Sequence, residues 1–466
     1  MTRSSSPPSP QAPDTSSSDV PEGGRTRMAK KGIWALLDQM LFAGANFLVV
    51  IGLAKWLDER AFGAFTTAYA CFLLIGVFVT ALIIEPLMVF GSGKYFDRRP
   101  HYLGKTLGIH LVITVAGGIV LMGVAAMCHV QGESKLATAM FCLALIQPMQ
   151  LLPWTLRNAT YLDSNPKPAA IAGFIYLAVV LGSLIGLNAA NQLTVVSAIL
   201  TMGMASTAAC AYLIRVLGVD LRAALQLHGY GEILRDHWRY GRWAVPTNLT
   251  RYVPEQLPYL ALPLLLAHQN GGVADLASGG ALKAVMNFAM PLTLFAWALS
   301  TLALPQLVRA RHTASFRTIT FKMGLAVVGV PLLCLPLLGL LGVWLVGTAY
   351  SGKYVEYGHL LWLVGLIPVT AGIDAMLHSQ LKAAERPDRL FWASVASSVV
   401  LLVAFAPLVW WGGVKGALIA IICGYLAQIV TLLACGGRII QAQSLPANHD
   451  TQPILSTTDT VPLAAP

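Results

Sequence analysis

Arg251 and Glu255 lie four residues apart in a largely apolar stretch between Gly241 and His268. In a helix this spacing places both charges on one face. Neither charge can face hydrocarbon without a large cost in free energy, so the shared face must point into a bundle interior or a water-filled cavity. Arg251 is therefore the leading candidate for a functional site, and a purely structural ion pair with Glu255 is the alternative.

Four further ionisable residues stand inside apolar stretches. Glu85 precedes Pro86 and can bind a coupling proton or cation; the alternative is an interhelical hydrogen bond beside a proline kink. Asp374 and His378 are four residues apart and can relay a proton, because histidine titrates near neutrality. A structural role is favoured for this pair, since both residues approach the end of their stretch. Lys283 can contact an anion in a cavity, although a long side chain that reaches back to water is favoured.

The composition excludes a soluble globular protein. Of the 466 residues, 56% are apolar and only 11% are charged, whereas soluble domains carry about 25% charged residues. The sequence therefore predicts an all-α polytopic membrane protein. The formal charge of +10 does not indicate a nucleic-acid partner, because the basic residues lie in short loops between apolar stretches, where membrane topology accounts for them.

The sequence contains no pattern that indicates a metal, cofactor or catalytic site. The seven cysteines stand singly, without the paired spacing of a disulfide framework or a zinc site. The P-loop pattern for nucleotides, the HExxH pattern of zinc proteases and the GxSxG pattern of hydrolases are absent. We therefore expect no cofactor and no enzyme activity.

Twelve apolar stretches are long enough to cross a membrane as helices. They cover residues 33–54, 64–90, 104–128, 136–156, 169–189, 193–214, 244–268, 279–304, 321–346, 358–381, 390–411 and 416–437. With a cytoplasmic N-terminus, 24 of the 31 Lys and Arg residues fall in inside segments and five fall in outside loops. Because positive residues concentrate on the cytoplasmic side, this split supports the twelve spans and places both termini in the cytoplasm.

The spans divide six and six about a central polar segment. We expect a disordered cytoplasmic tail over 1–27, an N-terminal six-helix lobe over 28–217, a cytoplasmic amphipathic linker over 218–243, a C-terminal six-helix lobe over 244–440 and a second disordered cytoplasmic tail over 441–466. The first tail is rich in Ser and Pro and too poor in apolar groups to fold. Paired six-helix bundles are a common plan among transporters.

Several segments resemble a known family. They are WALLDQMLFAGANFLVVIGLAKWLDERAFGAF, ALIIEPLMVF, GRW, ALKAVMNFAMPLTLFAWALSTLALPQL and QLKAAERPDR. Together they resemble the oligosaccharide flippases of the multidrug/oligosaccharidyl-lipid/polysaccharide exporter (MOP) superfamily. The resemblance implies two six-helix lobes around a central cavity. It also implies movement of undecaprenyl-diphosphate-linked oligosaccharides from the cytoplasmic to the periplasmic leaflet of a bacterial inner membrane, for surface polysaccharide synthesis.

The resemblance also suggests roles for the ionisable residues. Arg251 would bind the diphosphate, because a guanidinium can fork onto phosphate oxygens, and Lys283 would assist. Residues expected to line the cavity or to couple transport to an ion are Glu85, Glu255, Asp374 and His378.

The first lobe departs from one branch of that superfamily. It has almost no cation at mid-membrane depth, whereas lipid II flippases have several and usually carry two extra helices. This argues against the lipid II branch and leaves Lys94, Arg98 and Arg157 at the inner mouth as additional cations for the diphosphate. Asp38 opens the first span, where an acidic residue suits a helix N-terminus, so we assign it a structural role.

The expected partners are the lipid-linked oligosaccharide, membrane lipids and a polysaccharide polymerase or other assembly proteins. Two other functions stay open. A cation-coupled multidrug antiporter of the same superfamily would have an acidic, aromatic-lined cavity. A membrane polysaccharide polymerase or ligase would usually need a large outer loop with Arg and His, and the short outer loops argue against it.

Overall fold

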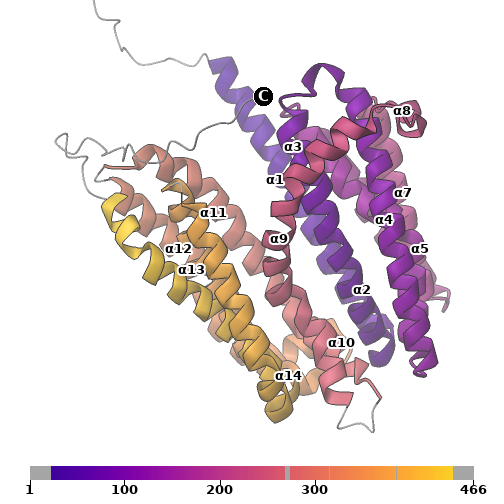
Figure 1. The fold of residues 1–466 in the computed structure, drawn as a ribbon. Helices are drawn as coiled ribbons and strands as arrows, with labels where there is room; N and C mark the ends of the chain where they lie inside the picture. Colours follow the sequence, from indigo (N-terminus) through magenta and orange to yellow (C-terminus); the bar gives the residue numbers. More distant parts are fainter. Residues whose placement is uncertain (1–21, 268–272, 314, 385, 444–466) are drawn as a thin grey trace, which may run out of the picture.

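The computed structural model describes residues 22–267, 273–313, 315–384 and 386–443. Every regular element in these ranges is helical (Figure 1), which confirms the predicted all-α class. The predicted tails at 1–27 and 441–466 fall mostly outside the described residues. Where the structure does describe them, the first helix already begins at Glu22 and the last ends at Gln443.

The first half of the chain forms the first six predicted spans. In order, they are α1 (Glu22–Trp56), α2 (Glu59–Val79) with its continuation through η1 (Thr80–Ile84) and α3 (Glu85–Gly91), α4 (Arg99–Val130) after the turn η2 (Phe96–Arg98), α5 (Ser134–Tyr161), α6 (Lys167–Ala189) and α7 (Val195–Leu217). The turn η1 is π-helical. Such widened turns occur mostly as single interruptions of α-helices, frequently at functional sites.

The second half follows the short helix α8 (Leu221–Leu225). Its elements are α9 (Tyr230–Leu266), α10 (Leu276–Asn287), α11 (Met290–Ala310), α12 (Ser315–Ala349), η4 (Val355–Leu360), α13 (Leu361–Ala383) and α14 (Pro387–Gln443). The apolar part of α14, Asp388–Gly437, has 50 residues and would extend about 75 Å, against a hydrocarbon core of about 30 Å. Gly413, with φ 52° and ψ −127°, breaks it into two arms (Figure 1), so α14 provides two spans.

The prediction of one continuous helix over 279–304 is wrong. The structure ends α10 at Asn287 and begins α11 at Met290. Pro291 has no N–H to donate to the carbonyl of Asn287, which weakens the helical hydrogen-bond ladder at this point. The amides of Phe288 and Ala289 bond instead to the carbonyls three residues earlier. The eighth span is therefore built from two helices that meet at a break.

Helix α9 begins earlier than the predicted seventh span. It starts at Tyr230, so the second part of the segment expected as a linker, 218–243, is continuous with the span itself. Its internal prolines do not interrupt the helix, but the ribbon bends as it passes from α8 toward α10 (Figure 1). The division of the chain into lobes at this segment stays a prediction.

The start of α9 is fastened to the first half of the chain. The Nδ1–H of the buried His237 donates to the carbonyl of Leu82 in η1 at 2.8 Å, and its Nε2 accepts from the hydroxyl of Tyr102 at 2.8 Å. Both ring nitrogens are thereby satisfied in the neutral form of the imidazole. The far end of α9 packs beside α10 and α14. Helix α9 therefore connects the two halves along its length.

The halves meet closely where α2 passes α10, at what we call the α10 end (Figure 1). A Cβ atom at Gly63 of α2 would lie 1.7 Å from the carbonyl oxygen of Leu276, and a Cβ at Gly280 would lie 3.1 Å from the amide nitrogen of Gly63. Only glycine permits this approach of two backbones. At the opposite end, called the α3 end, the ribbons of α3 and α11 diverge (Figure 1).

Polar contacts add to the closure of the α10 end. The Nζ of Lys353, from the turn before η4, donates to the carbonyl oxygens of Lys55 at 2.9 Å and Leu57 at 2.6 Å. Glu133, between α4 and α5, accepts from the amide of Ala274 at 3.1 Å. These bonds join the two halves, so separation of the halves at this end must break them.

Replacing Gly63 by alanine should open the α10 end. The added methyl group would overlap the Leu276 carbonyl, so α2 and α10 must shift apart, at a cost of about 1–3 kcal/mol. We expect faster maleimide labelling of a cysteine placed at the buried Ser278 in a background without the native cysteines. Gly123→Ala in α4 is the control, because a Cβ there meets no atom within 4 Å. Equal labelling of the two variants would contradict this packing argument.

Candidate functional site

Helix α9 carries a row of side chains at four-residue spacing, which we call the α9 ladder. Its members are Arg239, Trp243, Thr247, Arg251, Glu255 and Tyr259. All except Tyr259 are exposed in the structure. Successive members at this spacing are neighbours on a helix surface. Because exposed charges in a membrane helix cannot face lipid at low cost, this side of α9 faces a water-accessible space.

The middle of the ladder meets residues of the second half. Tyr425 of α14 interacts electrostatically with Glu255, Asp374, Tyr259 and Arg251. The structure therefore brings Arg251 and Glu255 of α9 close to Asp374 of α13, although they are more than a hundred positions apart in the sequence. A cation, two carboxylates and phenol groups together can bind either an anion or a cation, depending on which charges the ligand neutralises.

Arg251 and Glu255 are not a closed ion pair. The two side chains interact electrostatically, but neither makes a hydrogen bond or an ion pair within 4 Å among the described residues. The guanidinium of Arg251 thus keeps its five N–H donors available. The structural ion pair considered from the sequence is not formed in this conformation.

Lys283 points toward the same region from α10. Its Nζ lies 4.8 Å from the centroid of the Tyr259 ring, at a distance where an ammonium group is attracted to the face of an aromatic ring. The side chain is partly buried. Lys283 is therefore placed within the protein beside the last member of the ladder, where its charge adds to that of Arg251.

Asp374 and His378 lie against each other on α13. The Nδ1 of His378 is 3.1 Å from the Oδ1 of Asp374 and 3.0 Å from the backbone oxygen of Asp374. Since a carbonyl only accepts, Nδ1 carries the proton and donates to the backbone. The carboxylate oxygen Oδ1 is buried without a hydrogen bond among the described residues. The proton-relay role of this pair stays a prediction.

Glu85 bonds across to α9. It follows the π-helical turn η1, and its Oε1 accepts from the Nδ2 of Asn248 at 2.8 Å. This is the interhelical hydrogen bond that was the alternative to a coupling role. Asn248 is three residues before Arg251 on α9, so this bond places Glu85 beside the α3 side of the ladder. The coupling role of Glu85 stays a prediction.

A groove of about 840 Å³ lies between α3 and α9 and is called the α3–α9 groove. Its lining includes the side chains of Glu85, Phe90, Lys94, Asp236, Arg239 and Trp243. Lys94 forms ion pairs of 2.7 Å with both Glu232 and Asp236. Burial alone would raise the pKa of Asp236, but hydrogen bonds from Lys94 and Tyr95 outweigh it and hold the pKa below the ordinary carboxyl value. Asp236 is therefore charged throughout the physiological pH range.

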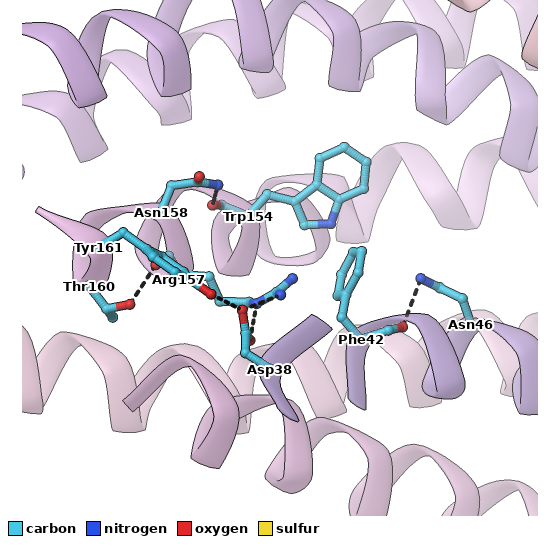
Figure 2. A network of polar contacts seen from close by, with 8 residues as sticks. All are labelled: Asp38, Phe42, Asn46, Trp154, Arg157, Asn158, Thr160 and Tyr161. Atoms are coloured by element: carbon cyan, nitrogen blue, oxygen red, sulfur yellow. Dashed lines mark hydrogen bonds and ion pairs between the residues drawn. The ribbon is translucent and has the colours of Figure 1, made fainter. Parts of the chain in front are cut away.

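The first half contains a buried polar network that the sequence did not predict (Figure 2). Asp38 of α1 is fully buried and accepts from the Nε of Arg157 at 2.9 Å and from its Nη2 at 2.8 Å. Tyr161 donates to the same carboxylate at 2.8 Å. The guanidinium carbon of Arg157 lies 4.1 Å from the centroid of the Phe42 ring. This network links α1 to α5. Its cation, Arg157, is one of the residues that the sequence suggested as additional cations for the diphosphate, and here it binds Asp38.

The helix-terminus interpretation of Asp38 is wrong, because α1 begins at Glu22 and Asp38 lies well inside it. The two partners are 119 positions apart, so no local pattern connects them. The one available signal was the predicted depth: Asp38 opens the first span and Arg157 follows the fourth, which places opposite charges at the same side of the membrane.

Comparison with known proteins supports the fold only. No model of a known protein family matches this sequence, and no curated protein is detectably similar to it. A solved inward-facing multidrug resistance MATE family transporter of the MOP superfamily superposes with a TM-score of 0.69 at 14% identity, over 88% of this chain and 96% of that one. The chain has the fold of the MOP-superfamily transporters. This fold consists of twelve membrane helices in two lobes.

Two further structures with the MOP fold are similar. The lipid II flippase MurJ in an inward closed conformation gives a TM-score of 0.67 at 12% identity, over 89% of this chain and 90% of that one. The outward-facing form of a multidrug resistance MATE family transporter gives 0.63 at 14% identity, over 89% and 96%. The TM-score is thus higher for the inward-facing and inward closed structures than for the outward-facing one.

Proposed function

We propose that this chain is a MOP-superfamily transporter that moves an undecaprenyl-diphosphate-linked oligosaccharide across the bacterial inner membrane. The observation that carries the proposal is the exposed guanidinium of Arg251, which has no hydrogen bond or ion pair among the described residues. An arginine that is kept charged and unpaired at membrane depth costs free energy. A ligand with an anionic group would offset that cost, because phosphate oxygens can accept the two parallel bonds of a guanidinium.

The surroundings of Arg251 suit the rest of such a substrate. Lys283 adds a second positive charge beside Tyr259, and a diphosphate carries more than one negative charge. The α9 ladder continues from Arg251 to Trp243 and Arg239 at the α3 end, where polar groups can hold sugars. A polyprenyl tail needs no polar site and can stay in lipid at the side of the protein.

A second candidate is a cation-coupled multidrug antiporter of the same superfamily. Glu255 and Asp374 both interact electrostatically with the phenol of Tyr425, and carboxylates with aromatic groups bind organic cations well. Arg251 within the same cluster opposes this function, because it repels a cationic ligand. An increase in drug sensitivity after deletion of the gene would favour the antiporter.

Deletion of the gene tests the proposal directly. We expect lipid-linked single repeat units to accumulate in the membranes and polymer to disappear from the surface, both measured by mass spectrometry and by glycan staining. Loss of a polymerase would give the same accumulation, so the leaflet of the trapped intermediate must be determined with a membrane-impermeant glycosidase on spheroplasts. Intermediates on the cytoplasmic side support the proposal; normal levels of intermediate and polymer would exclude it.

A further inference from the structure

The charges that line the α3–α9 groove balance one another. Glu85 and Asp236 are acidic, and Lys94 and Arg239 are basic. The carboxylates of Asp236 and Glu232 already contact Lys94. Their hydrogen bonds raise the pKa of the Lys94 ammonium group. The groove therefore has no excess positive charge at physiological pH, and it suits a neutral ligand better than a diphosphate.

The balanced groove nevertheless has polar groups to offer. The guanidinium of Arg239 makes no hydrogen bond or ion pair among the described residues. Within the described part of the chain, Glu85 receives one hydrogen bond, from Asn248 at 2.8 Å, and a carboxylate can accept about four. Donors and acceptors thus lie along one groove, which is the requirement for binding hydroxyl groups, since each hydroxyl both donates and accepts.

The walls of the groove are aromatic. Trp243 is 70% exposed, and Phe90 and Tyr240 meet edge to face with ring centroids 6.4 Å apart. The guanidinium carbon of Arg242 lies 5.6 Å from the Trp243 ring. The face of an aromatic ring carries partial negative charge and attracts weakly polarised C–H groups. An exposed indole beside hydrogen-bonding groups is therefore suited to a sugar ring, which has an apolar face of C–H groups and a rim of hydroxyls.

The groove also has the correct size and place. Its volume of about 840 Å³ lies within the usual range of small-ligand pockets, about 300–1,000 Å³. Trp243 and Arg251 are eight residues apart on the α9 ladder, which corresponds to about 12 Å along the helix. A diphosphate at Arg251 would thus leave the attached sugars within reach of the groove.

From these observations we infer that the α3–α9 groove binds the saccharide of the lipid-linked substrate, with Trp243 as the stacking surface and Arg239 and Glu85 as hydrogen-bonding groups. The inference rests on the proposed function and adds that two separate sites bind two parts of the substrate. The sugars are held in the groove at the α3 end, and the diphosphate is held separately at Arg251.

Saturation-transfer NMR with the purified full-length chain tests the inference. The probe is the phosphate-free oligosaccharide released by mild acid from the lipid-linked intermediates of the deletion strain. We expect wild-type protein to bind it and Trp243→Ala to weaken binding at least tenfold. Trp238→Ala is the matched control, because Trp238 is 62% exposed on the same helix but does not line the groove. Arg251→Ala should leave saccharide binding unchanged and should reduce binding of inorganic pyrophosphate.

The outcomes separate the inference from the proposed function. If intermediates accumulate on the cytoplasmic side of the deletion strain but Trp243→Ala binds the saccharide as Trp238→Ala does, the groove assignment is wrong and the flippase proposal stands. Failure of wild-type protein to bind the saccharide at millimolar concentration would also overturn the groove assignment. If no intermediate accumulates, the proposed function fails first, and the groove assignment falls with it.

Discussion

Arg251→Ala should abolish surface polysaccharide while the amount of protein in the membrane stays normal. The guanidinium is exposed on the α9 ladder and has no competing partner within 4 Å among the described residues, so its whole hydrogen-bonding capacity is available to the substrate. Loss of a two-bond contact between charged groups costs about 3 kcal/mol or more, which corresponds to a factor of about 100 in substrate affinity or rate. Complementation of the deletion strain, with quantification of surface polymer, measures the effect.

Two companion variants make this result specific. Arg251→Lys keeps the charge but loses the fork geometry, so it should restore an intermediate amount of polymer. Arg317→Ala removes an exposed arginine of α12, away from the ladder, and it should behave as wild type. Full polymer in the Arg251→Ala strain, at equal protein level, would remove the anion-binding role of Arg251.

Asp38→Ala should destabilise the first half of the chain more than any surface substitution. Arg157 is only 9% exposed and makes two bonds to the Asp38 carboxylate. Removing one partner of a buried ion pair leaves an uncompensated charge and costs about 3–5 kcal/mol. A guanidinium cannot shed its proton in a protein, so the unpaired Arg157 has no way to become neutral. Thermal unfolding of the purified protein in detergent measures the loss.

The reverse substitution gives an internal comparison. In Arg157→Met the remaining carboxylate of Asp38 can be neutralised by a proton, so this variant should be less damaged than Asp38→Ala. The double variant, Asp38→Ala with Arg157→Met, should be more stable than Asp38→Ala alone because no buried charge is left. Asp388→Asn, which breaks an exposed ion pair with Arg386, should not change the unfolding temperature measurably. Additive losses in the double variant would show that the two residues do not act as a pair.

The general fold could be predicted because it follows from local properties. Apolar length identifies the spans, and the distribution of Lys and Arg identifies their alternation. The α9 ladder could be found in part for the same reason, since the four-residue spacing of Arg251 and Glu255 is a local pattern. Their approach to Asp374 and Tyr425 required the packing of α14 against both α9 and α13, which no local pattern specifies.

The features that the sequence did not reveal depend on distant partners. Asp38 was assigned to a helix terminus because its partner, Arg157, is 119 residues away. The early start of α9 was missed because its first turns are stabilised by His237 bonding to Leu82 and Tyr102, whereas their own composition is that of a polar linker. The break before α11 had a visible signal in Pro291, which cannot donate to the preceding turn. The same rule would also break α9, whose internal prolines do not interrupt it, so a proline by itself did not locate the break.

The most direct test of the account is a leaflet assay with purified protein. Lipid-linked oligosaccharide from the deletion strain is incorporated into both leaflets of liposomes that contain the chain, and a glycosidase is added outside. Without transport, only the outer-leaflet pool is cleaved. The account predicts that wild-type protein, supplied with a proton or sodium gradient, makes nearly the whole pool accessible, and that Arg251→Ala protein does not. If the wild-type liposomes retain the same protected pool as protein-free liposomes under every gradient, the chain is not a flippase for this substrate.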